Sequence, residues 1–395
     1  MNPDGLSTRL TWLFAVACGL CVANIYFAQP LLEPIALSLQ LHAGLAGIVM
    51  TLTQLGYGTG LLLLVPLADV VENRRLIVLA MSGAVIGLAA AAASNSAATF
   101  LAASFVIGLC AVAAQVLVPF ASHLAPDATR GKVVGNVMAG LLAGIMLARP
   151  FSSALAAAFG WRAVFVVSAL LMAVLILVVR RALPQRRPSH ALGYLATLAS
   201  LPGIVRGTPL LRRRAGYQAL MFATFQAFWT AVPLALAHDF QLGQGGIALF
   251  AFAGAAGALV APWAGRLADR GLTRPATGAA MATVLLSFGV GALALRFHSL
   301  AALVVCALLV DGAVQMCQVL SIRSLYMLAP ELRGRLNGLF ISFVFACAAL
   351  ASGSAAAVYA YRGWGAVCVF GGALALLALL CYATEFRRQV RLAPT

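Results

Sequence analysis

The chain has 395 residues, of which 63% are hydrophobic and only 9% are charged. Soluble domains are about 25% charged and about half apolar, so this composition excludes an ordinary soluble globular protein. The formal net charge of +16 would suggest a nucleic-acid-binding protein, unless the positive side chains gather in loops on one side of a membrane.

Uncharged stretches long enough to cross a bilayer, which takes about 20 residues, follow one another along the chain. With charge clusters and turn residues as boundaries, they predict twelve membrane-spanning helices, at residues 10–32, 44–64, 76–94, 98–121, 133–155, 162–181, 213–237, 245–264, 275–296, 299–322, 336–358 and 365–384. We therefore expect an all-α integral membrane protein with an N-terminal six-helix half (1–181), a cytoplasmic linker (182–212) and a C-terminal six-helix half (213–395).

The basic residues predict the orientation of these helices. If the N-terminus is cytoplasmic, every Lys and Arg falls in a cytoplasmic segment except Arg149, Arg162, Arg296 and Arg362. Cytoplasmic loops of membrane proteins are rich in Lys and Arg, so the positive charge indicates topology and no nucleic-acid partner is expected. We expect a multi-pass protein of the bacterial inner or plasma membrane with both termini in the cytoplasm.

Two parts of the chain share landmarks, which indicates an internal duplication. Leu-Ala-Asp at 67–69 recurs at 267–269, and Gly-Trp at 160–161 recurs at 363–364. Two parallel repeats of six spans are typical of secondary transporters, whose substrate site lies near the middle of the membrane between the halves. The duplication therefore favours a pseudo-symmetric pair of six-helix bundles.

The second copy of this landmark carries a family signature. Residues 265–271 read Gly-Arg-Leu-Ala-Asp-Arg-Gly, and residues 65–75 keep the Leu-Ala-Asp and the arginines of the same motif. This pattern resembles the loop signature G-x-L-A-D-R-x-G-R-R of the major facilitator superfamily, and the resemblance covers essentially the whole chain. The segment 23–32 is similar to a bacterial efflux-permease-like subgroup near the arabinose-efflux and drug-proton antiporter branch.

The chain departs from the antiporter branch of that family at two places. Ser104 stands where the branch carries an Arg, four residues before Gly108. Gly135 and Gly144 keep the spacing of the branch's fifth-helix motif, but Arg149 stands where its proline would be. Antiport and proton coupling therefore have to be argued from other residues.

No motif for ATP hydrolysis or for enzymatic chemistry is present. The only lysine, Lys132, lies outside a P-loop pattern, and the HExxH and GxSxG patterns are absent. The sequence predicts no enzyme, no cofactor and no metal site. Uphill transport would then have to use an ion gradient.

Asp311 is an acidic residue about halfway along the expected helix 299–322. A charged carboxylate in the middle of a membrane costs several kcal/mol if it has no partner, and removal from water favours its protonated form. One hypothesis makes Asp311 the proton-coupling group. The alternative is a structural carboxylate bound to Arg149 or to a backbone group.

Arg149 is the one basic residue inside an expected span. Its guanidinium offers a fixed fork for carboxylates or phosphates, so it is a candidate for binding an anionic substrate. It could instead be the charge partner of Asp311, or extend to the membrane surface without a specific role.

Amide and aromatic side chains on expected helices 1, 2, 4, 7 and 10 are the candidates for the substrate cavity, because the resemblance implies that helices 1, 4, 7 and 10 line it. They are Asn24, Tyr26, Gln29, Gln54, Tyr57, Gln115, Gln218, Gln226, Trp229, Gln315 and Gln318. The alternative is interhelical hydrogen bonding, which contributes about 0.6 kcal/mol per bond. Helical spacing would also place Tyr26, Gln29 and Glu33 on one face.

Charged residues in two loops are candidates for gating, again because the resemblance implies it. They are Asp69, Arg74, Arg75, Asp269, Arg270 and Arg274. The alternative is that these charges only set the membrane topology.

These residues predict a secondary active transporter that moves a small organic solute by alternating access, with proton-coupled efflux as the expected mode. The first alternative is a proton-coupled uptake symporter for a sugar or an organic anion. An alternative of another class is a membrane-embedded enzyme or a non-transporting sensor. The expected partners are the solute, protons and the lipid bilayer, and the expected state is a monomer.

Overall fold

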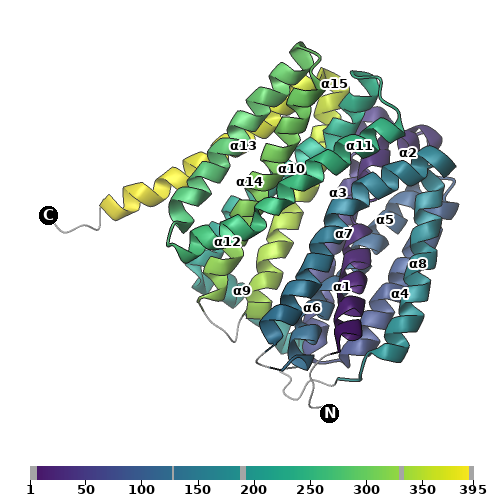
Figure 1. Cartoon of the computed structure of the whole chain (residues 1–395), viewed down its shortest axis with the longest axis vertical. Helices are drawn as coiled ribbons and strands as arrows, with labels where there is room; N and C mark the ends of the chain where they lie inside the picture. The colour runs from purple at the N-terminus through teal and green to yellow at the C-terminus, as the bar shows by residue number, and fades with distance from the viewer. Residues whose placement is uncertain (1–6, 127–128, 187–192, 329–332, 391–395) are drawn as a thin grey trace. The chain divides into compact units, whose positions relative to one another are not determined.

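The computed structural model describes residues 7–126, 129–186, 193–328 and 333–390. Within these ranges the regular elements are helices, and no strand occurs. The chain divides into two compact units, one made of Met1–Leu41 and Leu52–Gly203 and the other of His42–Thr51 and Ile204–Thr395. The all-α class expected from the sequence is confirmed (Figure 1).

The helices of the first unit follow the expected spans 1 to 6 in chain order. They are α1 (Thr8–Ala23), η1 (Gln29–Leu31), α2 (Leu32–Ser38), most of α3 (Ile48–Leu63), η3 (Val65–Asp69), α4 (Asn73–Ala93), α5 (Ala97–Ala111), α6 (Ala113–Leu124), α7 (Arg130–Phe159), α8 (Trp161–Ala182) and most of α9 (Tyr194–Gly207). The helix α9 lies inside the stretch expected to be a linker.

The second unit contains the remaining elements. They are η2 (Ala43–Leu45), α10 (Pro209–His238), α11 (Gln244–Ala255), η4 (Ala256–Val260), α12 (Ala261–Asp269), α13 (Thr273–Arg296), α14 (Leu300–Tyr326) and α15 (Arg333–Val390). The chain passes between the units inside α3, since residues up to Thr51 belong to the second unit and those from Leu52 to the first. Thr51 Oγ1 donates a hydrogen bond to the carbonyl oxygen of Ala349 in α15 at 2.7 Å, which is a contact within the second unit.

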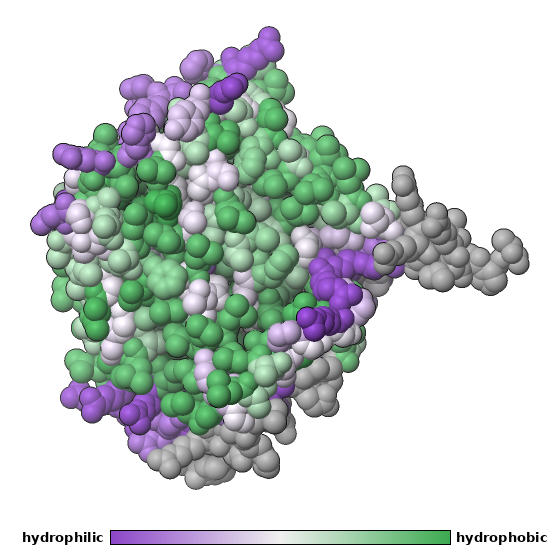
Figure 2. Space-filling model, turned by 180° about the vertical axis from the view of Figure 1, so that it is seen from behind, coloured by the Kyte–Doolittle hydropathy of each residue, from purple (hydrophilic) through white to green (hydrophobic). Residues whose placement is uncertain are grey.

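Nine segments in the described part of the chain are long and apolar enough to cross a membrane, and one of them, Gly334–Glu385, covers two expected spans. Two shorter apolar helices, Thr8–Ala23 and Gln244–Gly254, correspond to expected spans 1 and 8. On one side of α8, Leu170, Val174 and Leu177 each have an exposed fraction of 56–62%, as expected for a helix that faces lipid. Figure 2 shows apolar side chains over most of the face seen, with hydrophilic ones gathered along its margins.

The duplicated Gly-Trp landmark has the same local structure in both copies. Gly160 has φ +80° between α7 and α8, and Gly363 has φ +72° inside α15. Only glycine adopts this backbone conformation readily, so each Gly turns the chain back between two antiparallel helical segments. The following Trp161 and Trp364 are buried (7% and 2% exposed).

The first span differs from the expected continuous helix. Residues 24–28 form turns between α1 and η1, and Pro30 has no N–H with which to continue a helical ladder. The carbonyl oxygen of Phe27 accepts a hydrogen bond from Ser152 Oγ at 2.6 Å, which compensates for a lost helical bond. The segment keeps hydrogen bonds of the i→i+3 type, from the N–H groups of Tyr26 and Gln29 to the carbonyl oxygens of Ala23 and Tyr26, so the expectation that Tyr26, Gln29 and Glu33 share one face stays a prediction.

Glycines allow α3 and α5 to pack without intervening side chains. A Cβ added at Gly108 would lie 1.9 Å from the carbonyl oxygen of Thr53, and a Cβ at Gly56 would lie 2.2 Å from that of Phe105. Gly56 and Gly60 have the small-xxx-small spacing that brings membrane helices close together.

We expect Gly108→Ala to destabilise the protein by about 1–3 kcal/mol, because the added methyl group overpacks a backbone contact. Thermal unfolding of the purified protein in detergent measures the effect. Gly135→Ala is the matched control, since a Cβ at Gly135 meets nothing within 4 Å. Equal melting temperatures for the two variants would contradict this account of the α3–α5 contact.

Candidate functional site

The turn residues 24–28 together with η1 hold three of the expected cavity residues, all inside the first unit. Asn24, Tyr26 and Gln29 are 4%, 2% and 0% exposed. The N–H groups of Ile25 and Tyr26 donate to carbonyl oxygens three residues earlier instead of four, and irregular backbone is tolerated at membrane depth only where protein or a cavity surrounds it. The break is therefore a polar element within an otherwise apolar bundle.

Arg149 of α7 contacts this break. Its Nε donates a hydrogen bond to Gln29 Oε1 at 2.7 Å, and its guanidinium carbon lies 5.0 Å from the centroid of the Tyr26 ring. The side chain is 4% exposed, so it is held inside the first unit rather than extended to the membrane surface. The hydrogen bond and the cation–π contact fix the plane of the guanidinium.

A second pair of expected cavity residues meets within the same unit. Gln115 Nε2 on α6 donates a hydrogen bond to the hydroxyl oxygen of Tyr57 on α3 at 3.0 Å. Tyr57 is 2% exposed, and Gln54, one turn earlier on α3, is fully buried. The structure therefore brings residues from expected spans 2 and 4 together.

Asp311 and Trp229 meet inside the second unit. The indole Nε1 of Trp229 on α10 donates a hydrogen bond to Asp311 Oδ1 on α14 at 2.6 Å. Asp311 is 8% exposed and Trp229 is 1% exposed. An indole can only donate and a carboxylate can only accept, so this pair is chemically matched.

The surroundings of Trp229 hold its ring in place. Phe225, Phe228 and Phe250 lie with their ring centroids 6.5, 5.6 and 6.0 Å from that of Trp229. A Cβ on Gly254 would lie 2.8 Å from the indole, which leaves no room for a larger residue. The donor that faces Asp311 is therefore fixed by packing, and this fixed donor was not evident from the sequence.

The remaining expected cavity residues lie on α10 and α14. Gln218 and Gln226 on α10 are fully buried, whereas Gln315 and Gln318 on α14 are partly exposed. Since α14 is one continuous helix from Leu300 to Tyr326, Asp311, Gln315 and Gln318 lie along one side of it.

The loop carboxylate of the second repeat forms an ion pair. Asp269, at the end of α12, accepts a hydrogen bond from Arg323 Nη2 on α14. Nη1 of Arg323 also donates to the carbonyl oxygen of Gly265 at 3.1 Å. Arg323 therefore connects α14 to Gly265 and Asp269 of the signature sequence, although the sequence did not mark it as a gating residue.

The equivalent loop of the first repeat is arranged differently. The carboxylate of Glu72 caps α4 by accepting hydrogen bonds from the backbone N–H groups of Arg74 and Arg75 at 3.0 and 3.1 Å. Nη1 of Arg74 donates to the carbonyl oxygens of Arg180 and Leu183 at the end of α8. Glu72 was also missed, although an acidic residue just before a helix is a recognisable capping signal.

Comparison of the chain with known protein families identifies its family. The family model described as Major Facilitator Superfamily matches residues 12–211 and 214–394. The chain is a member of the major facilitator superfamily.

Other superfamily members show high similarity over the whole chain. It is 41% identical over 387 residues to the transporter YgaY of Escherichia coli O157:H7, with 97% of both chains covered. It is 35% identical over 379 residues to the probable transporter SCO4007 of Streptomyces coelicolor, with 95% of this chain and 87% of the relative covered. The family and these relatives establish a transporter that lies in a membrane and would bind a small-molecule substrate.

Solved superfamily structures share the fold. The nucleoside transporter NupG aligns with a TM-score of 0.78 at 13% identity, covering 96% of this chain and 100% of NupG. A D-xylose-proton symporter aligns with a TM-score of 0.75 at 14% identity, covering 94% of this chain and 96% of the symporter. At these identities the likeness shows the fold alone.

Variants of the Asp269–Arg323 ion pair can distinguish a role of these loop charges in gating from a role in setting the membrane topology alone. Both side chains are exposed (62% and 44%), so the pair contributes only about 0–1 kcal/mol to stability. If it gates, we expect Asp269→Asn to slow transport several-fold at an unchanged melting temperature, as measured by flux and thermal unfolding of one preparation. Arg266→Gln, an exposed charge change on the same helix, is the control. Recovery by the swap Asp269→Arg with Arg323→Asp would support the pair, and full activity of Asp269→Asn would contradict it.

Proposed function

We propose that this transporter exports a small organic solute in exchange for protons, with Asp311 as the group that binds and releases the proton. The observation that carries the proposal is the buried carboxylate of Asp311, bound by the fixed indole N–H of Trp229 at 2.6 Å. Ionisable residues at membrane depth are costly and are characteristic of proton relays and ion pathways.

The chemistry of this pair is suited to a two-state proton carrier. When ionised, Asp311 accepts a hydrogen bond from Trp229, and the negative charge has a fixed dipole beside it. When a proton binds, the carboxyl group becomes neutral and its burial cost falls. The change of charge can bias the protein between its two access states, because a ligand shifts a conformational equilibrium only through differential interaction.

Arg149, Gln29 and Tyr26 form the proposed solute-recognition element of the first unit. The guanidinium is held by Gln29 and by the Tyr26 ring, which preorganises it for a carboxylate or phosphate group. The other hypothesis is that Arg149 is the charge partner of Asp311, so that protonation of the carboxylate releases the arginine. A double variant that lacks both charged side chains distinguishes the two hypotheses.

The proposed setting is the bacterial inner or plasma membrane, with both termini in the cytoplasm and the protein acting as a monomer. This orientation rests on the distribution of Lys and Arg among the loops. The proposed organisation keeps two halves, 1–181 and 213–395, with 182–212 between them. In this frame the loops that carry Asp69 and Asp269 face the cytoplasm.

Transport by purified protein in proteoliposomes tests the proposal. Vesicles are loaded with a cationic dye, a sugar or an organic acid, and a pH gradient is imposed in either direction. Proton-coupled efflux predicts that solute moves against the proton flow, whereas an uptake symporter would move it with the proton flow. A solute flux that does not depend on the imposed pH gradient would contradict proton coupling. Conversion of a solute without flux would favour an enzyme.

A further inference from the structure

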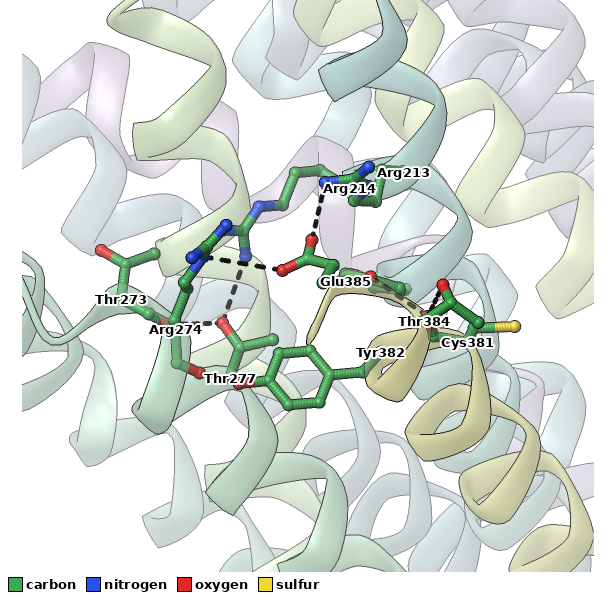
Figure 3. Close-up of polar contacts among 10 residues, drawn as sticks. Arg213, Arg214, Thr273, Arg274, Thr277, Cys381, Tyr382, Thr384 and Glu385 are labelled. Atoms are coloured by element: carbon green, nitrogen blue, oxygen red, sulfur yellow. Dashed lines mark hydrogen bonds and ion pairs between the residues drawn. The ribbon is translucent and has the colours of Figure 1, made fainter. Parts of the chain in front are cut away.

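Arg214 on α10 is a buried arginine that the proposed transport mechanism does not use. It is 6% exposed, and its Nη1 donates a hydrogen bond to Thr277 Oγ1 on α13 at 3.1 Å (Figure 3). Its Nε has no hydrogen-bond partner among the described residues. A guanidinium carries a permanent charge, so a neutral hydroxyl alone does not compensate for its burial.

The nearest acidic residue is engaged by other arginines. Glu385 accepts a hydrogen bond from Nη1 of Arg213 at 3.2 Å and lies 3.8 Å from Nε of Arg274. Figure 3 shows Glu385 between these two side chains, with Arg214 directed toward Thr277. Glu385 is therefore occupied by Arg213 and Arg274, whose side chains are 35% and 46% exposed, and the buried Arg214 has no carboxylate partner among the described residues.

Unsatisfied polar groups lie along the helices beside Arg214. Gln218, one turn further along α10, is fully buried, and neither of its side-chain amide atoms has a partner in the described part of the chain. Ser321 on α14 is also fully buried, and its hydroxyl has the thiol of Cys317, a weak hydrogen-bonding group, as a neighbouring partner. Cys317, one turn before Ser321, lies close enough to be affected by the charge of Arg214.

Leaving these groups unsatisfied would be costly. A buried donor or acceptor without a partner costs about 1–3 kcal/mol, and an uncompensated buried charge costs several kcal/mol. Buried water satisfies polar groups of this kind in many proteins. Water carries no charge, however, and therefore leaves the buried positive charge of Arg214 uncompensated.

We propose that Arg214, Gln218 and Ser321 form a binding site for a small inorganic anion of the size of chloride. Nε of Arg214, Nε2 of Gln218 and the hydroxyl of Ser321 are donors for the anion, and Gln218 Oε1 accepts a hydrogen bond from a water molecule beside it. The three side chains are 6%, 0% and 0% exposed, which favours a small ion over a lipid headgroup. The site lies within the second unit and does not involve Asp311.

Thermal unfolding of the purified full-length protein in chloride and in gluconate, at equal ionic strength, tests the site. A ligand that binds only the folded state stabilises it in a saturable way. We expect the melting temperature to rise with chloride or bromide and to reach a plateau, while gluconate has no effect. The result that overturns the proposal is one melting curve for all anions, which would mean that water fills the site.

Variants assign the response to particular residues. Arg214→Gln is expected to abolish the chloride response, and Gln218→Leu to weaken it. The matched control is Arg213→Gln, which changes the neighbouring arginine that binds Glu385 and should keep the response. If Arg214→Gln does not fold, Gln218→Leu and Ser321→Ala still report on the site. Loss of the response in Arg213→Gln but not in Arg214→Gln would overturn the assignment. Because the readout is stability, the result is independent of whether transport is proton-coupled.

Discussion

Replacing Asp311 by Asn is expected to abolish solute flux driven by a pH gradient while the protein still folds. Asparagine keeps the size of the side chain and can still accept a hydrogen bond from Trp229, but it cannot bind and release a proton in the physiological range. Flux in proteoliposomes under an imposed pH gradient measures the effect, and size-exclusion chromatography and thermal unfolding report on folding. Solute exchange without a gradient should survive, because alternating access does not itself require the proton.

Two further variants make the Asp311 prediction specific. Trp229→Phe removes the hydrogen bond at 2.6 Å and keeps the aromatic packing. Since a hydrogen bond to a charged group contributes about 1.5–3 kcal/mol, we expect a loss in gradient-driven rate of about tenfold or more. Asp239→Asn is the control, because Asp239 lies at the end of α10 and accepts a hydrogen bond from the hydroxyl of Tyr359. Wild-type gradient-driven flux in Asp311→Asn would contradict the proton-coupling role.

Replacing Arg149 by Ala is expected to inactivate transport. The change removes the guanidinium that is bonded to Gln29 and lies over Tyr26. It leaves the buried amide of Gln29 without this donor. Arg149→Lys keeps the charge but loses the planar fork, so it should restore only part of the activity if the arginine binds an anionic group. Solute binding and flux are measured separately for each variant.

The double variant Arg149→Ala with Asp311→Asn decides between the two roles of Arg149. If the two side chains neutralise each other, removing both is less harmful than removing Arg149 alone, because Asp311 is then not left as an uncompensated buried charge. Recovery of gradient-independent exchange therefore favours pairing, whereas complete loss of solute binding favours substrate contact. Arg162→Ala is the matched control, since Arg162 also lies over an aromatic ring, that of Trp161, at 4.3 Å, but is only partly buried at the start of α8. Full activity of Arg149→Ala would contradict both roles.

The fold could be predicted from the sequence because membrane insertion depends mainly on composition. Runs of about 20 uncharged residues have few alternatives to a helix in a bilayer. The major facilitator fold followed from the loop signature at 265–271, and the family comparison confirms it. The predicted boundaries failed where proline and polar residues interrupt a span, as at Pro30 between α1 and α2.

The candidate site could be predicted only in part. Asp311 and Arg149 were identifiable because a charged residue in an apolar run is conspicuous and costly. Their partners were not, since Trp229 lies on a different helix from Asp311 and Gln29 lies on η1, far from Arg149 in the sequence. The same limit applies to Arg214, which reads in the sequence as one of three consecutive arginines in a topology-setting cluster.

The amino-acid sequence by itself determined the class of protein, the approximate spans and the residues whose charge needs compensation, because these depend on composition and local order. The tertiary structure alone decided which groups meet: Trp229 with Asp311, Gln29 and Tyr26 with Arg149, and Thr277 with Arg214. It also decided that Arg214 is buried whereas Arg213 is partly exposed. The physical reason is that burial and hydrogen bonding between helices depend on how side chains distant in sequence pack against each other, which helical periodicity does not specify.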